Sequence, residues 1–272
     1  MITLSTQLTT QVRLMQHMAA AATCAAVPLQ PAYVPIIAGH GLGPRNPKTK
    51  THVGDTWVTL LNDTVATLEV GLQPLCISYT ARGHGESHGW EDTAGSNPTQ
   101  FTWRALSGDM VAVADYYNVP RFVAAGSSMG GATALFAAAM HPGRVAGLVM
   151  IRPPTAWASR LARRKFLLSS AAKCAAEEAG TGERYHLVLQ GAALADLPDP
   201  SAATAEESEY TAIRCPVLLL TVEGDDSHPV STAQTLHALL PQSTLHVAPT
   251  AEAAVVAWPA IIRDFLATVH AP

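Results

Sequence analysis

The chain has 272 residues, of which 48% are hydrophobic and only 14% are charged, and its formal net charge at pH 7 is -4. This length and composition suit a globular α/β protein with a sizeable core and argue against a disordered chain. The slight acidic excess gives no reason to expect nucleic acid or an anionic membrane as a partner. The four cysteines are far apart and form no CxxC pair. We therefore expect neither a disulfide framework nor a zinc site.

The sequence also bears on where the protein resides. No apolar run reaches the 18 or so residues that a membrane-spanning helix needs. The Ala-rich residues 18–27 follow Arg13 and faintly resemble a signal peptide, but their flanks are polar and they lack a long leucine-type core. We therefore expect a cytoplasmic protein, with no membrane or nucleic-acid partner.

Short apolar runs alternate with longer segments of helical spacing along the chain. The runs expected to form strands are residues 34–38, 75–79, 121–125, 145–151, 216–222 and 244–248. The segments expected to form helices are residues 56–68, 104–117, 129–140, 231–240 and 259–269. This alternation predicts a mostly parallel sheet with helices on both faces, with functional residues at the carboxyl ends of the strands.

The alternation breaks between residues 155 and 214. We expect a largely helical insertion there, so that residues 1–154 and 215–272 form one core domain. The insertion begins with a basic run that contains Arg160, Arg163, Arg164 and Lys165. Such a run is most often a solvated helix face, and a role in holding an anionic substrate is the alternative.

The strongest local motif is GSSMGG at residues 126–131. It matches G-x-S-x-G where an expected strand meets an expected helix, which is the context in which this pattern presents a nucleophilic serine. The small residues Gly126 and Gly130 permit a sharp turn that exposes the hydroxyl of Ser128. Ser128 is therefore the candidate nucleophile, and Ser127 is expected to support the turn. A plain tight turn around a buried serine is the alternative.

A second motif, GHGLGP, follows the first expected strand at residues 39–44. A serine nucleophile needs two backbone N–H groups aimed at the developing oxyanion. We expect one from Met129, directly after the nucleophile, and the other from Leu42 in this loop. His40 and Gly41 are expected to brace the loop. In the third motif, RGHGES at residues 82–87, we expect His84 to be structural.

The chain resembles α/β-hydrolase-fold enzymes of the lactonase/esterase type. The resemblance is carried by motifs that occur in the order of that family: the HG loop, the RGHG turn, the GSSMGG elbow, the prolines at 153–154 and the segment CPVLLLTVEGDDSHP at 215–229. The resemblance covers about residues 30–270. It implies an α/β-hydrolase fold, no cofactor or metal, and a small helical cap at 155–214 that shapes the substrate pocket. The family's acid usually lies four residues before a proline after the strand here expected at 216–222. Pro229 then indicates Asp225, with Asp226 as the alternative.

The sequence departs from this family at the catalytic base. The family's histidine usually precedes a proline by some seven residues, between the last strand and the closing helix. Glu252 occupies that position relative to Pro259, and no histidine lies between His246 and His270. The usual source of the base is therefore missing, although a serine hydroxyl is a poor nucleophile without one.

Three hypotheses follow from this departure. His228 can supply the base from the loop that carries Asp225. Glu252 can supply it if burial or a neighbouring carboxylate raises its pKa. Alternatively the serine–base couple is lost, and the pocket binds a ligand or performs lyase, cyclase or isomerase chemistry through the oxyanion site.

The resemblance implies a cofactor-free serine hydrolase with an atypical triad. We expect it to cleave a small, mostly apolar carboxylic ester or lactone through an acyl-enzyme, with cleavage of a carbon–carbon bond beside a ketone also within the family's range. The competing class is a non-hydrolytic protein on the same fold. The sequence does not indicate an oligomeric state.

Overall fold

The centre of the molecule is a seven-stranded sheet, which the computed structural model orders as β1-β3-β2-β4-β5-β6-β7. The structure describes residues 12–13, 34–43, 55–68, 74–84, 87, 97–180, 184–201 and 209–269. The segment 18–27, Pro44 and the end of the RGHG turn lie outside the described residues. The strands are β1 (Val12–Arg13), β2 (Ile36–Gly39), β3 (Cys76–Tyr79), β4 (Phe122–Ser127), β5 (Val145–Ile151), β6 (Val217–Val222) and β7 (Ser243–Ala248). Strands β2 to β7 pair in parallel, and β1 pairs antiparallel with β3 at one edge.

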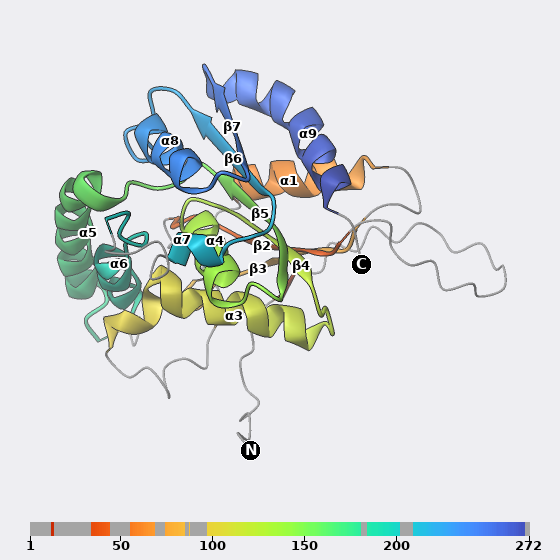
Figure 1. Ribbon diagram of the computed structural model, residues 1–272. Helices are drawn as coiled ribbons and strands as arrows, with labels where there is room; N and C mark the ends of the chain where they lie inside the picture. Colours follow the sequence, from red (N-terminus) through yellow and green to blue (C-terminus); the bar gives the residue numbers. More distant parts are fainter. Residues whose placement is uncertain are drawn as a thin grey trace.

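Helices cover both faces of this sheet (Figure 1). Helices α1 (Thr56–Ala66) and α9 (Ala251–Thr268) pack on one face, in a cluster centred on Leu61 and Trp258. Helices α3 (Trp103–Tyr116), α4 (Met129–Met140) and α8 (Val230–Leu239) pack on the other. Nearly all of α4 is buried, in keeping with its apolar, Ala-rich sequence. The expected mostly parallel sheet with helices on both faces is confirmed.

The closing helix differs from the expectation. Helix α9 begins at Ala251 rather than at Pro259, and Pro259 lies inside it. Proline is favoured in the first turn of a helix, which is why it marked the expected start. Thr250 starts the helix earlier, because its hydroxyl accepts a hydrogen bond of 3.1 Å from the amide of Ala253. As a result Glu252 lies in the first turn of a helix rather than in a loop.

The described part of residues 155–214 is largely helical. It contains α5 (Trp157–Glu177), α6 (Tyr185–Leu194) and the short α7 (Glu209–Ala212). Helices α5 and α6 lie side by side at one end of the sheet (Figure 1). Helix α6 also packs on the 3-10 turn η1 (Pro98–Phe101) through Phe101 and Leu187. The division of the chain into a core and a cap stays a prediction.

Within the described part of the chain, no helix combines the length and the apolar character needed to cross a membrane.

Candidate active site

The turn between β4 and α4 holds Ser128 in a strained backbone conformation. Its φ is 50° and its ψ is -110°, a region that residues other than glycine rarely adopt. The flanking glycines are required by close approach. A Cβ at Gly130 would lie 2.0 Å from the carbonyl oxygen of Gly39, and one at Gly126 would lie 2.4 Å from the carbonyl carbon of Gly130. The GSSMGG motif therefore forms a tight elbow that presents the side chain of Ser128.

The loop after β2 is fixed by His40 and by Asp55, the residue that caps α1. The amide of Ala81 donates to Nε2 of His40 at 2.9 Å, so the proton of this ring is on Nδ1, which lies 2.8 Å from the carbonyl oxygen of Gly41. The amide of Gly41 donates to Oδ2 of Asp55 at 2.7 Å. These contacts are those of a brace, the role expected for His40 and Gly41. His84 lies beside His40, with ring centroids 4.8 Å apart.

Leu42 and Met129 lie in the wall of a cavity of about 340 Å³ that also contains Ser128 and His228. Met129 is the first residue of α4, so no carbonyl of that helix accepts its amide hydrogen. Among the described residues, none accepts a hydrogen bond from the Leu42 amide either. The structure thus brings both expected oxyanion donors to the same cavity as the serine.

His228 connects Ser128 to Asp225. Its Nε2 lies 2.8 Å from Oγ of Ser128, and its Nδ1 lies 2.8 Å from Oδ2 of Asp225. Asp225 and His228 both belong to the loop that follows β6. This loop is held by two hydrogen bonds of 3.0 Å, from the amide of Ser227 to Oδ1 of Asp225 and from the amide of His228 to the carbonyl of Asp225.

Arg152 is a site residue that the sequence reasoning missed. It directly follows β5, has a φ of 53°, and donates to Oδ2 of Asp225 through Nε at 2.9 Å and through a terminal nitrogen. Its guanidinium also lies over the ring of Trp57, 5.4 Å from the centroid. Its place at the carboxyl end of an expected strand was the available signal, because functional residues gather there in parallel sheets.

The charges of Asp225, His228 and Arg152 affect one another's pKa values. Burial alone would raise the pKa of Asp225, but hydrogen bonds and charge from Arg152 and His228 outweigh it and hold that pKa below its ordinary value. Burial lowers the pKa of His228, and the positive charges of Arg152 and Arg163 lower it further, against the opposing effect of Asp225. His228 is therefore held in its neutral form, which can accept a proton.

The structure does not bring Glu252 to Ser128. Glu252 is exposed in the first turn of α9 and lines neither of the cavities near the site. Its pKa is lowered by its own amide and by the hydroxyl of Thr250, whereas a carboxylate base needs a raised pKa. Asp226 is exposed as well. It lines a second cavity of about 510 Å³ beside Asp225 and is not bonded to His228.

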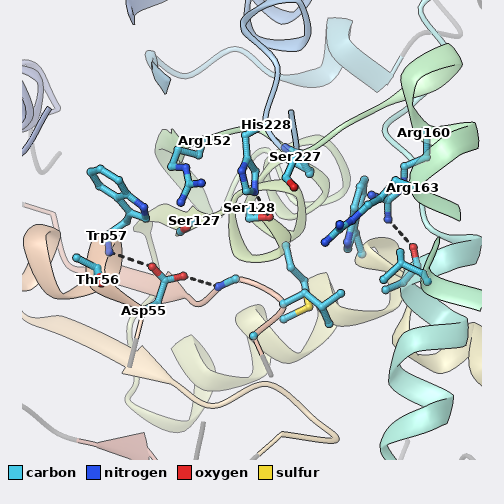
Figure 2. Close-up of a pocket in the computed structure, with 18 residues that line it drawn as sticks. Asp55, Thr56, Trp57, Ser127, Ser128, Arg152, Arg160, Arg163, Ser227 and His228 are labelled. Atoms are coloured by element: carbon cyan, nitrogen blue, oxygen red, sulfur yellow. Dashed lines mark hydrogen bonds between the residues drawn. The ribbon is translucent and has the colours of Figure 1, made fainter. Parts of the chain in front are cut away.

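Charged side chains line the cavity around Ser128 on two sides. Figure 2 shows Asp55 and Trp57 on one side, Arg160 and Arg163 of α5 on the other, and Ser128 between them with His228 hydrogen-bonded to it. The basic run of the expected insertion thus contributes two arginines to the site.

A metal site was not expected, and in the part of the chain that the structure describes no three His, Cys, Asp or Glu side chains are grouped so as to hold an ion.

A family model described as the alpha/beta hydrolase fold matches residues 55–172. Among solved structures, the chain is similar to a thermophilic esterase from Thermogutta terrifontis, at 20% identity over 88% of this chain and 91% of the other, with a TM-score of 0.56. It is similar to Est816, described as an N-acyl homoserine lactone degrading enzyme, at 21% identity over 86% and 92%, with a TM-score of 0.55. It is also similar to an enol-lactonase from Burkholderia xenovorans LB400, at 19% identity over 86% and 91%, with a TM-score of 0.54. No curated protein sequence matches the chain. Family model and structural neighbours agree on the architecture, and the chain has the α/β-hydrolase fold.

Proposed function

We propose that this protein is a cofactor-free serine hydrolase that cleaves a small carboxylic ester or lactone. The observation that carries the proposal is the continuous hydrogen-bonded chain from Ser128 through His228 to Asp225, with 2.8 Å at each of its two contacts. Nucleophile, base and orienting acid in this arrangement define a catalytic triad whatever their positions in the sequence. The unusual feature is that acid and base come from one loop.

In the proposed reaction, Oγ of Ser128 attacks the carbonyl carbon of the substrate while Nε2 of His228 takes the hydroxyl proton. The carbonyl π electrons move to the oxygen, and the resulting oxyanion accepts hydrogen bonds from the amides of Leu42 and Met129. When the intermediate collapses, the bond to the leaving oxygen breaks and His228 returns the proton to that oxygen. Water then cleaves the acyl-enzyme through the same steps and restores Ser128.

Asp225 keeps the proton of His228 on Nδ1, so that Nε2 faces the serine as an acceptor, and it stabilises the imidazolium that forms. Arg152 holds the same carboxylate from the other side. Arg152 is therefore proposed as a positioning residue that acts through Asp225.

The structural neighbours support this chemistry, since their descriptions name an esterase, a lactone-degrading enzyme and an enol-lactonase. The assembled triad also favours hydrolysis over the non-hydrolytic alternative, which assumed that Ser128 had no base.

The proposal is tested by assaying the purified protein against p-nitrophenyl esters of short acids and against five- and six-membered lactones at pH 7 to 8. We expect turnover of at least one of these esters or lactones, and loss of that turnover in Ser128→Ala. Ser128→Ala should unfold at the same temperature as the wild type. Turnover that survives in Ser128→Ala, or no turnover of any ester or lactone, would contradict the proposal.

A further inference from the structure

We propose that the ester or lactone cleaved at this site carries a carboxylate, and that Arg163 on α5 binds it. This inference rests on the proposed function and names the substrate class of the same site. It replaces the mostly apolar substrate expected from the sequence.

The cavity around Ser128 contains an excess of positive charge. Its lining includes the guanidinium groups of Arg152, Arg160 and Arg163 and one carboxylate, that of Asp55. The Asp55 carboxylate is already occupied by backbone amides. It accepts from Gly41 at 2.7 Å and from Trp57 at 3.0 Å. Among the described residues, no arginine forms an ion pair with it.

Two of the three arginines have fixed structural partners. Arg152 is bonded to the carboxylate of Asp225. Arg160 is buried, stacks 4.4 Å from the ring centroid of Trp103, and donates only to neutral oxygens, which are the carbonyls of Ala192 and Ala195 and the hydroxyl of Thr155. Burial lowers the pKa of Arg160 to about 10, so it still carries its charge at neutral pH. Among the described residues no carboxylate is hydrogen-bonded to Arg160, although the charge of Asp196 acts on it.

Arg163 differs from both. It is half-buried on α5, lines the cavity, and lies over the ring of Phe166 at 4.8 Å from the centroid. In the part of the chain that the structure describes, no carboxylate pairs with it. Its charge contributes to the lowered pKa of His228, so its field reaches the reacting group. A planar guanidinium without a carboxylate partner is well suited to bind a substrate carboxylate through two parallel hydrogen bonds.

The basic run was expected to form a solvated face of the helix, and this interpretation fits Lys165 but not Arg163. Lys165 is exposed and does not line the cavity, whereas Arg163 faces Ser128 across it (Figure 2). The volume of about 340 Å³ lies at the lower end of the range for small-molecule sites. These dimensions favour a compact substrate with one carboxylate, such as a half-ester of a short dicarboxylic acid or a lactone that bears a carboxyl group.

The test compares substrates that differ only in the charge. Mono-p-nitrophenyl glutarate carries a carboxylate, and its methyl ester has nearly the same shape without the charge. We expect the wild type to favour the charged ester by about 10-fold or more in kcat/KM, as one charge-assisted contact would give. Arg163→Gln should lose this preference, mainly through a higher KM for the charged ester, so that its kcat/KM values for the two esters become nearly equal. Lys165→Gln, which removes a charge from the same helix, should keep the preference. An equal rate for both esters in the wild type, or a preference that survives in Arg163→Gln, would overturn the assignment.

Binding of glutarate itself, measured by calorimetry, separates the two proposals. If Ser128 is not a nucleophile, no ester turns over, but glutarate should still bind to the wild type and bind about 10-fold more weakly to Arg163→Gln. Failure of hydrolysis with Arg163-dependent binding would contradict the proposed function alone. Hydrolysis of neutral esters without Arg163-dependent binding would contradict the carboxylate site alone.

Discussion

Asp225 and His228 belong to one turn of the loop after β6, and their side chains meet at 2.8 Å between Oδ2 and Nδ1. The same turn is closed by the hydrogen bond from the amide of His228 to the carbonyl of Asp225. The relative position of the two side chains is therefore set largely within this loop, and Arg152 holds the Asp225 carboxylate in addition. The position at which the resemblance leads us to expect histidine holds Glu252, and it lies in the first turn of α9.

Replacing the orienting acid should separate the two neighbouring aspartates. Asp225→Asn keeps the shape of the side chain but cannot hold the neutral His228 in the productive tautomer. We expect kcat to fall by about 10³- to 10⁴-fold. Asp226→Asn is the matched control, because Asp226 is exposed and is not bonded to His228. Steady-state rates of the two variants with one ester provide the comparison. An equal loss in both variants would contradict the assignment of Asp225.

The pH dependence of kcat/KM should reflect the lowered pKa of His228. The reaction needs neutral His228, so the rate falls on the acid side as this residue becomes protonated. Because burial and the charges of Arg152 and Arg163 lower this pKa, the midpoint of the acid limb should lie below the ordinary histidine value of about 6.5. A rate profile between pH 4.5 and 8.5 locates the midpoint. A midpoint above 7 would be inconsistent with this environment.

Removal of the Arg152 side-chain charge should shift the acid-side midpoint of the pH profile of kcat/KM to higher pH. Arg152→Gln takes away a positive charge that lowers the pKa of His228, whereas Asp225, whose charge raises that pKa, remains hydrogen-bonded to it. The protonated form of His228 then becomes more stable, so the acid midpoint should shift to higher pH. Arg152→Lys keeps the charge without the two-nitrogen contact, and its midpoint should remain closer to that of the wild type. An unchanged midpoint in Arg152→Gln would show that Arg152 has only a structural role.

The elbow glycine Gly130 should tolerate no side chain. A Cβ there would lie 2.0 Å from the carbonyl oxygen of Gly39, so the two backbones must separate. We expect Gly130→Ala to lower the free energy of unfolding by at least about 1–3 kcal/mol. Gly108→Ala is the control, because a Cβ at this exposed position of α3 meets nothing within 4 Å and alanine favours the helix. Urea unfolding measures the free energy of unfolding of both variants. Equal values for Gly130→Ala and Gly108→Ala would refute the close approach of the Gly130 and Gly39 backbones.

The sequence predicted the strands and helices of the core well because their apolar periodicity is strong, and the segments 129–140 and 145–151 match α4 and β5. It also indicated Ser128 and the Asp225 loop through motifs with local geometry. It left the base open, because whether a histidine reaches a serine 100 positions away depends on packing. Arg152 was missed for the same reason, since its partner lies on the loop that follows the neighbouring strand β6, about 70 positions later in the chain.

The expected start of α9 was wrong because a threonine cap at Thr250 determines where the helix begins. With the helix expected to begin at Pro259, Glu252 was expected to lie in the loop before it. In the helix, Glu252 instead gains the stabilisation that an acidic residue finds near a helix N-terminus.

The rate at which a fluorophosphonate labels Ser128 tests the central claim most directly, because labelling reports the nucleophile and its base without requiring the natural substrate. The wild type should be labelled at neutral pH on the peptide that contains Ser128, as mass spectrometry would locate. His228→Ala should slow labelling by about 10³-fold or more, while Glu252→Gln should be labelled at the wild-type rate. Labelling that is unaffected in His228→Ala, or that is lost in Glu252→Gln, would contradict the Ser128–His228–Asp225 triad.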